Sequence, residues 1–349
     1  MIALIESGHR VFVIGQADHT TIKLNELRVT TVDVTFGRNG FNFLRDAHYL
    51  LTLKKLIASE KPEIIHFFHA KPIIFGGFLR LVAKTKNLKM VATITGLGRA
   101  FEQSVLKRLV AGFCYKYLLR KYDSVIFQNR DDLKLFLDNQ WVSKETAKLI
   151  LGSGVDLSRF RLSQRTNKSK VAFVSRLINP KGVGDFIMLA ERLSQRFPDY
   201  EFILGGEHDI DDTDAYPIEN IRECESAGFL KYQSYIIDMP QLLEETVLFV
   251  FPSVYREGVP RVCLEAVACG VPVVAYEVPG TREIVVNNVS GITVEKSNYE
   301  QLEGAVCQLL NDEAKRNSLA LSGRAFVEKE FDLNSVTREY LETYKIDLN

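Results

Sequence analysis

The chain has 349 residues, of which 46% are hydrophobic and 25% charged, and its 44 basic residues balance 44 acidic ones. This is the composition of an ordinary globular protein, and the length suits two α/β domains better than one. The sequence excludes a membrane-spanning helix, because no apolar run approaches the ~18 residues required. It also excludes a signal peptide, because Glu6, His9 and Arg10 interrupt the apolar start. The five cysteines form no CxxC pair, which argues against a disulfide frame and favours a reduced, cytosolic protein.

The neutral total hides a basic half and an acidic half. Residues 1–150 carry 23 Lys and Arg against 13 Asp and Glu, a net charge of +10, and the remaining residues carry 21 against 31, a net charge of −10. A basic half suits phosphate-bearing partners such as an anionic membrane surface, a lipid diphosphate or nucleic acid. The alternative is that the two halves have diverged in isoelectric point without any function attached.

Short apolar strands alternate with helical patterns along most of the chain. Helical periodicity is clear at Phe43–Ile57, Val105–Leu119 and Val183–Arg196. This alternation predicts parallel sheets with right-handed crossovers. Strands are predicted at Val11–Ile14, Glu63–Phe67, Met90–Thr95, Ser124–Phe127, Lys148–Leu151, Lys170–Ser175, Glu201–Leu204, Val247–Phe251, Val271–Ala275 and Gly291–Val294.

The polar stretch LSRFRLSQRTNKS divides the pattern into two units. We predict an N-terminal domain over residues 1–156, a linker over 157–169, a C-terminal domain over 170–330 and a closing helix within 331–349. Each domain is expected to be a doubly wound, Rossmann-like α/β unit, and the two are expected to face each other across a cleft.

The most informative segment is FPSVYREGVPRVCLEAVACGVPVV, from Phe251 to Val274. A strand ends there, a loop with Glu257 follows, and a helix from Arg261 carries Glu265. Both carboxylates are therefore expected at the carboxyl edge of a sheet, where open α/β folds bind ligands. A carboxylate there accepts hydrogen bonds from sugar or ribose hydroxyls, or stabilises positive charge on a sugar ring. The alternative is that both are ordinary solvated glutamates.

A second segment, VAFVSRLINPKGV, places Arg176 at the end of a strand and Lys181 at the start of a helix. Two cations at these positions, together with the helix dipole, form a clamp for a diphosphate. The alternative is an exposed Arg and Lys in a turn. The glycines at Gly205 and Gly206 end another strand and permit close approach of a ligand to the backbone.

These segments resemble the family 4 glycosyltransferases of the GT-B fold, whose signature is Glu-x7-Glu followed by a Gly-x-Pro-Val strand. The resemblance covers nearly the whole chain. It implies that Glu265 holds the donor ribose, that Glu257 contacts the donor sugar, and that the backbone of Gly258 and Val259 approaches the sugar or phosphate. Arg176 and Lys181 would neutralise the leaving nucleoside diphosphate, so that no metal or other cofactor is expected.

The resemblance also places the donor base near Tyr235–Asp238, although Ser234 stands where the family usually has a glycine. On the acceptor side, His69 and Lys71 follow a strand and are candidates for binding a hydroxyl or phosphate, whereas His66 is more typical of a structural histidine. Many family members have a histidine in the next loop, where this chain has Thr95-Gly96-Leu97-Gly98-Arg99. The glycines Gly96 and Gly98, with Arg99, are most similar to bacterial members that act on polyprenyl-diphosphate sugars.

Residues Arg99–Lys121 carry six cations and one acid, interleaved with aromatic and apolar residues. A basic amphipathic helix of this kind is typical of an anionic membrane interface, and the alternative is an ordinary core helix. No recognised nucleic-acid motif accompanies it. The expected location is therefore cytoplasmic, peripheral on the inner face of the plasma membrane.

The resemblance implies a retaining enzyme that moves a hexose or N-acetylhexosamine from a nucleotide-diphosphate sugar, with UDP favoured over GDP, to a lipid-linked saccharide in surface polysaccharide or glycan assembly. Two other hypotheses are a GT-B enzyme of another class, such as a sugar-nucleotide epimerase, and an inactive, truncated sugar-nucleotide-binding protein. The second is raised by residues 1–15, because in the family a first strand and a glycine-rich loop precede the corresponding segment.

Overall fold

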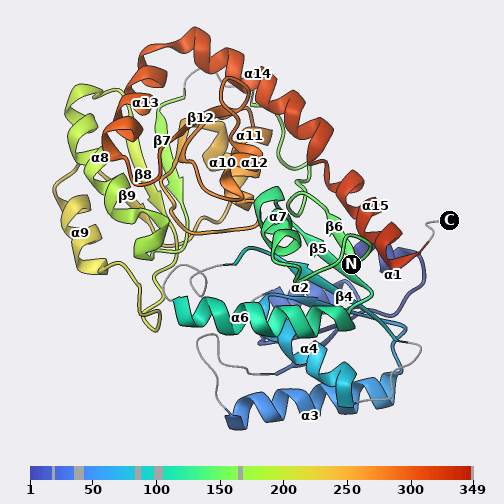
Figure 1. Ribbon diagram of the computed structural model, residues 1–349. Coiled ribbons are helices and arrows are strands. Elements are labelled where there is room, and N and C mark those ends of the chain that lie inside the picture. The colour runs from blue at the N-terminus through green and yellow to red at the C-terminus, as the bar shows by residue number, and fades with distance from the viewer. Residues whose placement is uncertain (18–19, 35–42, 83–87, 98–104, 164–167, 347–349) are drawn as a thin grey trace.

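The computed structural model describes residues 1–17, 20–34, 43–82, 88–97, 105–163 and 168–346, and shows two α/β domains connected by two crossings of the chain (Figure 1). Each domain is built on parallel strands with helices packed against them, as strand–helix alternation predicts.

The C-terminal domain is built on a six-stranded parallel sheet in the order β12-β11-β10-β7-β8-β9. All six residues of the central strand β10 are buried, because helices cover both faces of such a sheet. The strands are β7 (Lys170–Val174), β8 (Glu201–Gly205), β9 (Lys231–Gln233), β10 (Thr246–Phe251), β11 (Val273–Tyr276) and β12 (Gly291–Val294). The helices are η2 (Asn179–Lys181), α8 (Val183–Arg196), α9 (Ile218–Ser226), α10 (Met239–Glu244), α11 (Arg261–Ala268), α12 (Thr281–Ile284), α13 (Tyr299–Asn311) and α14 (Glu313–Glu330).

The N-terminal domain holds a four-stranded parallel sheet in the order β3-β4-β5-β6 and a separate parallel pair, β1 and β2. Within the described ranges no ladder joins the pair to the larger sheet, and the expectation of a preceding strand stays a prediction. The strands are β1 (Phe12–Gly15), β2 (Thr30–Asp33), β3 (Ile64–Phe68), β4 (Lys89–Ile94), β5 (Ser124–Phe127) and β6 (Ala147–Leu149). The helices are α1 (Ile2–Glu6), α2 (Thr20–Glu26), α3 (Phe43–Glu60), α4 (Ala70–Val82), α6 (Val105–Leu118), η1 (Leu119–Lys121) and α7 (Arg130–Asp138).

The ten predicted strands are confirmed, with ends that differ by at most two residues. The structure adds β2 and β9, which the sequence analysis missed. Both are short and lie at the edge of their sheets, and β9 has the sequence Lys-Tyr-Gln, so neither shows the apolar run that marks a buried strand.

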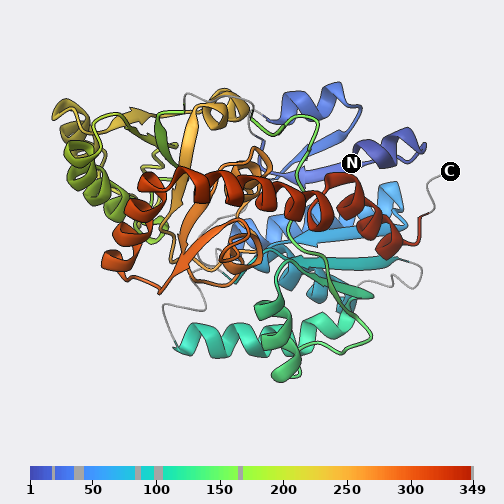
Figure 2. The same ribbon diagram turned by 90° about the horizontal axis from the view of Figure 1, so that it is seen from above.

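The last helix, α15 (Leu333–Tyr344), leaves the C-terminal domain and lies on the N-terminal one (Figure 2). Val336 packs in a cluster with Val91 and Ile126 of the N-terminal sheet and with Ile150, which directly follows β6. His66 on β3 is within 2.5 Å of the Tyr344 hydroxyl and 2.7 Å of the Thr93 hydroxyl. Burial lowers the pKa of His66 to about 3, so its ring is neutral and structural.

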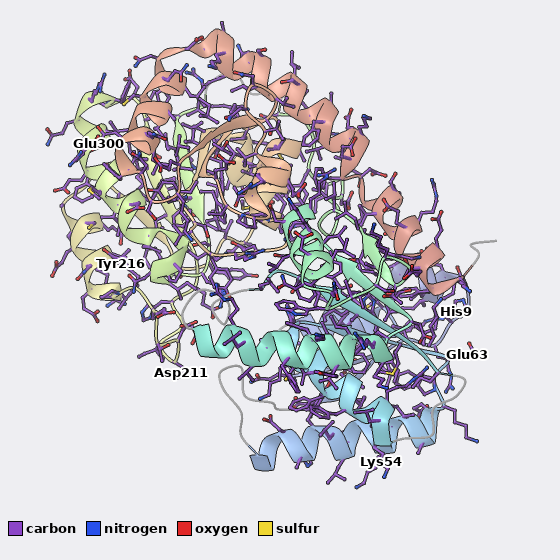
Figure 3. The ribbon with its side chains drawn as sticks, viewed as in Figure 1. His9, Lys54, Glu63, Asp211, Tyr216 and Glu300 are labelled. Carbon is purple, nitrogen blue, oxygen red and sulfur yellow. The ribbon has the colours of Figure 1, made fainter. Side chains whose placement is uncertain are left out.

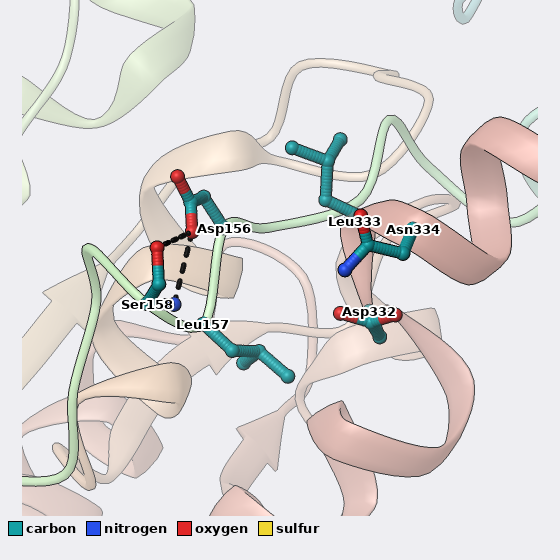
Figure 4. A pocket seen from close by; sticks show the side chains of 6 residues that line it. All are labelled: Asp156, Leu157, Ser158, Asp332, Leu333 and Asn334. Carbon is teal, nitrogen blue, oxygen red and sulfur yellow. Dashed lines mark hydrogen bonds between the residues drawn. The ribbon is translucent and has the colours of Figure 1, made fainter. Parts of the chain in front are cut away.

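The two crossings of the chain lie side by side. The Val155 amide donates to the Phe331 carbonyl at 2.9 Å, and the Leu333 amide donates to the Val155 carbonyl at 3.1 Å. Gly154 has φ +72°, and a Cβ there would lie 2.9 Å from the Leu333 Cα, so glycine permits the close approach. A hollow of about 270 Å³ opens beside these crossings, and it is lined by Asp156, Leu157, Ser158, Asp332, Leu333 and Asn334 (Figure 4).

Candidate active site

The loops that follow β4, β5, β7 and β10 meet where the two domains touch. All four leave the carboxyl ends of parallel strands, the edge at which α/β folds bind ligands. Gly258 of the C-terminal domain donates its amide to the Thr95 carbonyl of the N-terminal domain at 3.0 Å. The Glu257 carbonyl accepts from Asn129 Nδ2, also at 3.0 Å. The predicted site residue Glu257 therefore lies at the contact between the domains.

Lys181 and Glu257 form an ion pair at the centre of this region. Lys181 ends η2 and is only 7% exposed, and its ammonium lies 5.4 Å from the ring of Phe251 and 5.3 Å from that of Tyr255. A buried ammonium requires a partner, and the Glu257 carboxylate supplies it. Gly182 makes the position possible, because it has φ +81° and a Cβ there would lie 2.1 Å from the Pro252 carbonyl oxygen.

Glu265 lies on α11 and is 8% exposed. Arg261, one turn earlier on the same helix, donates from Nε to Glu265 Oε1 at 3.0 Å. Burial raises the pKa of Glu265, and the nearby Arg261 opposes this shift. The sequence analysis did not single out Arg261, although its spacing of four residues from Glu265 is a signal for such a pair.

We expect donor binding to weaken on acidification because of Glu265. Its pKa lies above the ordinary value of 4.5, so protonation begins at a higher pH than for a free glutamate. A protonated carboxyl loses acceptor capacity, which the predicted ribose contact of Glu265 requires. Donor KM should therefore rise on acidification, beginning at a higher pH than a glutamate of ordinary pKa would give, and the Glu265→Gln variant should show a high KM with no such rise. A variant that keeps the wild-type pH profile would assign the titration to another group.

Arg176 follows β7, and its ion-pair partner is Asp212 rather than Glu257. Its side chain is 54% exposed, and its Nη1 is 3.8 Å from Asp212 Oδ2. Asp212 belongs to an acidic loop between β8 and α9, in which Asp211 and Tyr216 are labelled in Figure 3. The structure therefore brings one of the two predicted clamp cations to Glu257, and the clamp itself stays a prediction.

The two glycines that end β8 have packing roles within the chain. Gly206 has φ +149°, and a Cβ there would lie 1.8 Å from the Ser175 carbonyl oxygen. A Cβ at Gly205 would lie 2.8 Å from Ile236 Cδ1. These contacts account for both glycines without a ligand, and their predicted part in donor binding is untested.

Tyr235 follows β9 and is 63% exposed. Nearby, Asp238 is the N-cap of α10, because its Oδ1 accepts from the Gln241 amide at 3.3 Å. Val259 is 8% exposed and packs in the C-terminal core, with its Cβ 3.1 Å from the position that a Cβ on Gly152 would take. These residues stay candidates for donor binding.

On the N-terminal side, His69 and Gly96 lie near Glu257. His69 Nδ1 is 2.8 Å from the Thr95 hydroxyl, and burial lowers the pKa of His69. His69 also has φ +68°, an uncommon conformation for a residue with a side chain. Gly96 has φ +104°, and a Cβ there would lie 2.6 Å from the Glu257 carbonyl carbon. Glycine at position 96 thus permits the close approach of the Glu257 loop backbone.

The remaining acceptor-side residues are placed differently. Lys71, on α4, has its ammonium 2.7 Å from Asp46 Oδ1 on α3, and both side chains are largely buried. Lys71 is thus engaged between two helices of its own domain. Gly98 and Arg99 lie outside the described residues.

Asn129 and Asp132 contact the Glu257 loop from the N-terminal domain, and neither was among the predicted site residues. Asn129 is the N-cap of α7 and accepts from the Asp132 amide at 2.7 Å. The sequence Asn-Arg-Asp-Asp after an apolar strand is a recognisable helix start, but nothing in it points to the other domain.

Family profiles account for both halves of the chain. Residues 2–159 match the profile described as Glycosyltransferase Family 4, and residues 155–326 match Glycosyl transferases group 1. Together with the paired α/β domains and the glutamate loop between them, these matches show that the chain belongs to the family 4 glycosyltransferases. It is therefore a glycosyltransferase.

Particular relatives resemble nearly the whole chain. It is 27% identical to N,N'-diacetylbacillosaminyl-diphospho-undecaprenol alpha-1,3-N-acetylgalactosaminyltransferase of Campylobacter jejuni, over 98% of this chain and 92% of that one. It is 25% identical to UDP-Gal:alpha-D-GlcNAc-diphosphoundecaprenol alpha-1,3-galactosyltransferase of Escherichia coli, over 80% of this chain and 74% of the relative. The crystal structure of Anabaena HepE with UDP and glucose superposes with a TM-score of 0.79 at 21% identity, covering 99% of this chain and 94% of that one. This confirms the GT-B fold.

Proposed function

We propose that this glycosyltransferase moves a hexose or N-acetylhexosamine from a UDP-sugar to a polyprenyl-diphosphate-linked saccharide, with retention at the anomeric carbon. The observation that carries the proposal is the buried Lys181–Glu257 pair at the contact between the domains. The names of the Campylobacter and Escherichia relatives, each with a diphospho-undecaprenol acceptor, support the acceptor class. The UDP bound to the similarly folded HepE is consistent with the nucleotide.

In this proposal, each residue of the site has a role that follows from its position. Glu265 accepts hydrogen bonds from the ribose, and Glu257 contacts the donor sugar. Lys181 and Arg176 stabilise the charge on the departing diphosphate, and the acceptor hydroxyl attacks from the same face while the leaving phosphate takes its proton. His69, which contacts the Thr95 hydroxyl, serves the acceptor side in this proposal. Contact between the domains excludes water that would otherwise hydrolyse the donor.

Product formation is expected only when donor and acceptor are both present. Purified protein would be incubated with a panel of UDP- and GDP-sugars, with and without undecaprenyl-diphosphate-linked N-acetylhexosamine. We expect release of UDP with the acceptor and an α-linked product by NMR. Rates should be the same with EDTA, because Arg176 and Lys181 supply the positive charge. Interconversion of the sugar without acceptor would instead indicate an epimerase, and nucleotide-sugar binding without turnover would indicate a binding protein.

An exposed apolar face suggests where the lipid-linked acceptor is presented. On α6, Leu109, Val110, Phe113 and Tyr117 are 51–65% exposed, and they alternate with the basic residues Arg108 and Lys116. On the neighbouring α4, Phe78 and Leu81 are 46% and 55% exposed. No helix among the described residues is long and apolar enough to cross a bilayer. We propose that this face lies on the anionic inner surface of the plasma membrane.

Sedimentation with vesicles tests this surface. The protein should pellet with vesicles that contain phosphatidylglycerol, remain in the supernatant with phosphatidylcholine alone, and be released at high salt, since salt screens the attraction. Phe113→Ser should weaken pelleting, whereas Ile237→Ser, which alters an 89% exposed residue of the other domain, should not. Equal recovery with the two lipids would count against the membrane surface.

A further inference from the structure

Three consecutive residues of the glutamate loop are held by the N-terminal domain. Arg256 donates from Nε to Asp132 Oδ1 at 2.8 Å, and its Nη2 lies 2.7 Å from the same oxygen. The Glu257 carbonyl accepts from Asn129, and the Gly258 amide donates to the Thr95 carbonyl. The carboxylate of Glu257 is bound from the opposite side, by Lys181 of its own domain.

The groups that hold the loop are themselves rigidly placed. Asp132 and Asn129 are fully buried and lie at the start of α7, directly after the buried strand β5. Asp132 Oδ2 accepts from Asn129 Nδ2 at 3.0 Å while Oδ1 takes Arg256. The carboxylate thus fixes the amide of Asn129 with its nitrogen toward the Glu257 carbonyl. Because both carboxylate oxygens of Asp132 are hydrogen-bonded in a buried site, the positions of Asn129 and Arg256 are well defined.

The backbone around the loop packs closely against it. A Cβ at Gly96 would lie 2.6 Å from the Glu257 carbonyl carbon, and one at Gly280 would lie 2.0 Å from the Gly258 carbonyl oxygen. Gly258 itself faces Gln128, whose Oε1 would be 2.4 Å from an added Cβ. The loop is therefore enclosed between the two domains, and its conformation depends on both.

We propose that Asp132, Asn129 and Arg256 are positioning residues for Glu257, and that they make the geometry of this donor-site carboxylate depend on contact with the N-terminal domain. The acceptor-binding half of the enzyme would thereby control whether the donor sugar is correctly held. The inference rests on the proposed role of Glu257 at the donor sugar. It assigns no contact with substrate to the three residues themselves.

A simpler alternative is that Asp132 and Arg256 only hold the domains together. The same interface offers a matched comparison, because Arg282 Nε lies 3.5 Å from Asp131 Oδ2. This pair also joins the domains, and Asp131 is the neighbour of Asp132, but neither member contacts residues 256–258 in the interactions given above. Loss of the Arg282–Asp131 pair therefore reports on domain attachment without touching the glutamate loop, although Arg282 also pairs with Glu277 of its own domain at 3.8 Å.

The test compares Arg256→Gln, Asp132→Asn, their double variant and Arg282→Gln, with the undecaprenyl-linked acceptor and the UDP-sugar that supports transfer. We expect Arg256→Gln and Asp132→Asn each to lower kcat at least ~10-fold, the scale of misplacing a catalytic group, with donor KM changed less than ~3-fold. The double variant should be no slower than the slower single variant, because the two substitutions remove the same Arg256–Asp132 interaction. Arg256→Lys should retain part of the rate, and Arg282→Gln nearly all of it.

Two further measurements separate the possible failures. The rise in melting temperature on adding UDP should be unchanged in Arg256→Gln, which shows a folded donor domain; if Asp132→Asn does not fold, the partly exposed Arg256 still provides the test. Glu257→Gln should be at least as slow as Arg256→Gln. An active Glu257→Gln enzyme would overturn the role of Glu257. A slow Glu257→Gln enzyme beside an unaffected Arg256→Gln, or equal losses in Arg256→Gln and Arg282→Gln, would overturn the positioning proposal.

Discussion

Replacing Lys181 with alanine is expected to lower the rate of sugar transfer at least ~100-fold, the usual cost of removing one strong contact to developing charge. Lys181 is the buried cation that the structure places against Glu257, so its loss removes positive charge from the proposed diphosphate site and also leaves the carboxylate without its ion-pair partner. Glu265→Ala should reduce transfer on the same scale, because it removes the proposed ribose contact. Steady-state kinetics of purified variants would measure both effects.

Lys170→Ala is the matched control for Lys181→Ala. Lys170 also forms an ion pair with a glutamate, Glu245, and its side chain is 20% exposed, but it lies at the opposite end of β7. We expect its transfer rate to stay within ~3-fold of wild type. Melting curves would show whether each variant is folded. Near-normal turnover in a folded Lys181→Ala enzyme would contradict the assignment of the donor site.

The second large effect is expected from Val336→Asp, which should abolish stable folding of the N-terminal domain. Val336 is 2% exposed in α15 and packs with Val91, Ile126 and Ile150 of the N-terminal domain. An unpaired carboxylate in this cluster costs several kcal/mol, comparable with the ~5–15 kcal/mol that stabilises a typical domain. Thermal unfolding and limited proteolysis would detect the loss, with cleavage concentrated in residues 1–156.

Leu321→Asp is the control for this substitution. Leu321 lies on α14 and is 63% exposed, so the same change places the charge in water. Its melting temperature should remain close to that of wild type. If Val336→Asp melts like Leu321→Asp, then α15 does not contribute to the core of the N-terminal domain, and the packing described above is wrong in solution.

Many of the secondary-structure elements follow from the local pattern of apolar residues in the sequence. Strands such as Thr246–Phe251 are continuous apolar runs, and a fully buried parallel strand has to be one. The positions of Glu257, Lys181 and Glu265 at the carboxyl edge of one sheet follow in turn, because the chain must leave each strand there before entering a helix. The sequence by itself therefore determined the fold class, and it predicts the domain division and the region of the site.

The tertiary structure alone decided which residues meet. Asn129 and Glu257 are 128 positions apart, and Asp132 and Arg256 are 124 apart, so no periodicity relates them. Lys71 carried a suitable charge for phosphate, yet its partner is Asp46 on a neighbouring helix. Gly96 and Gly206 are glycines because another backbone passes within reach, which only the folded chain reveals. Hydrophobic periodicity reports how each residue is buried in its own element, whereas these contacts depend on how separate elements and domains pack.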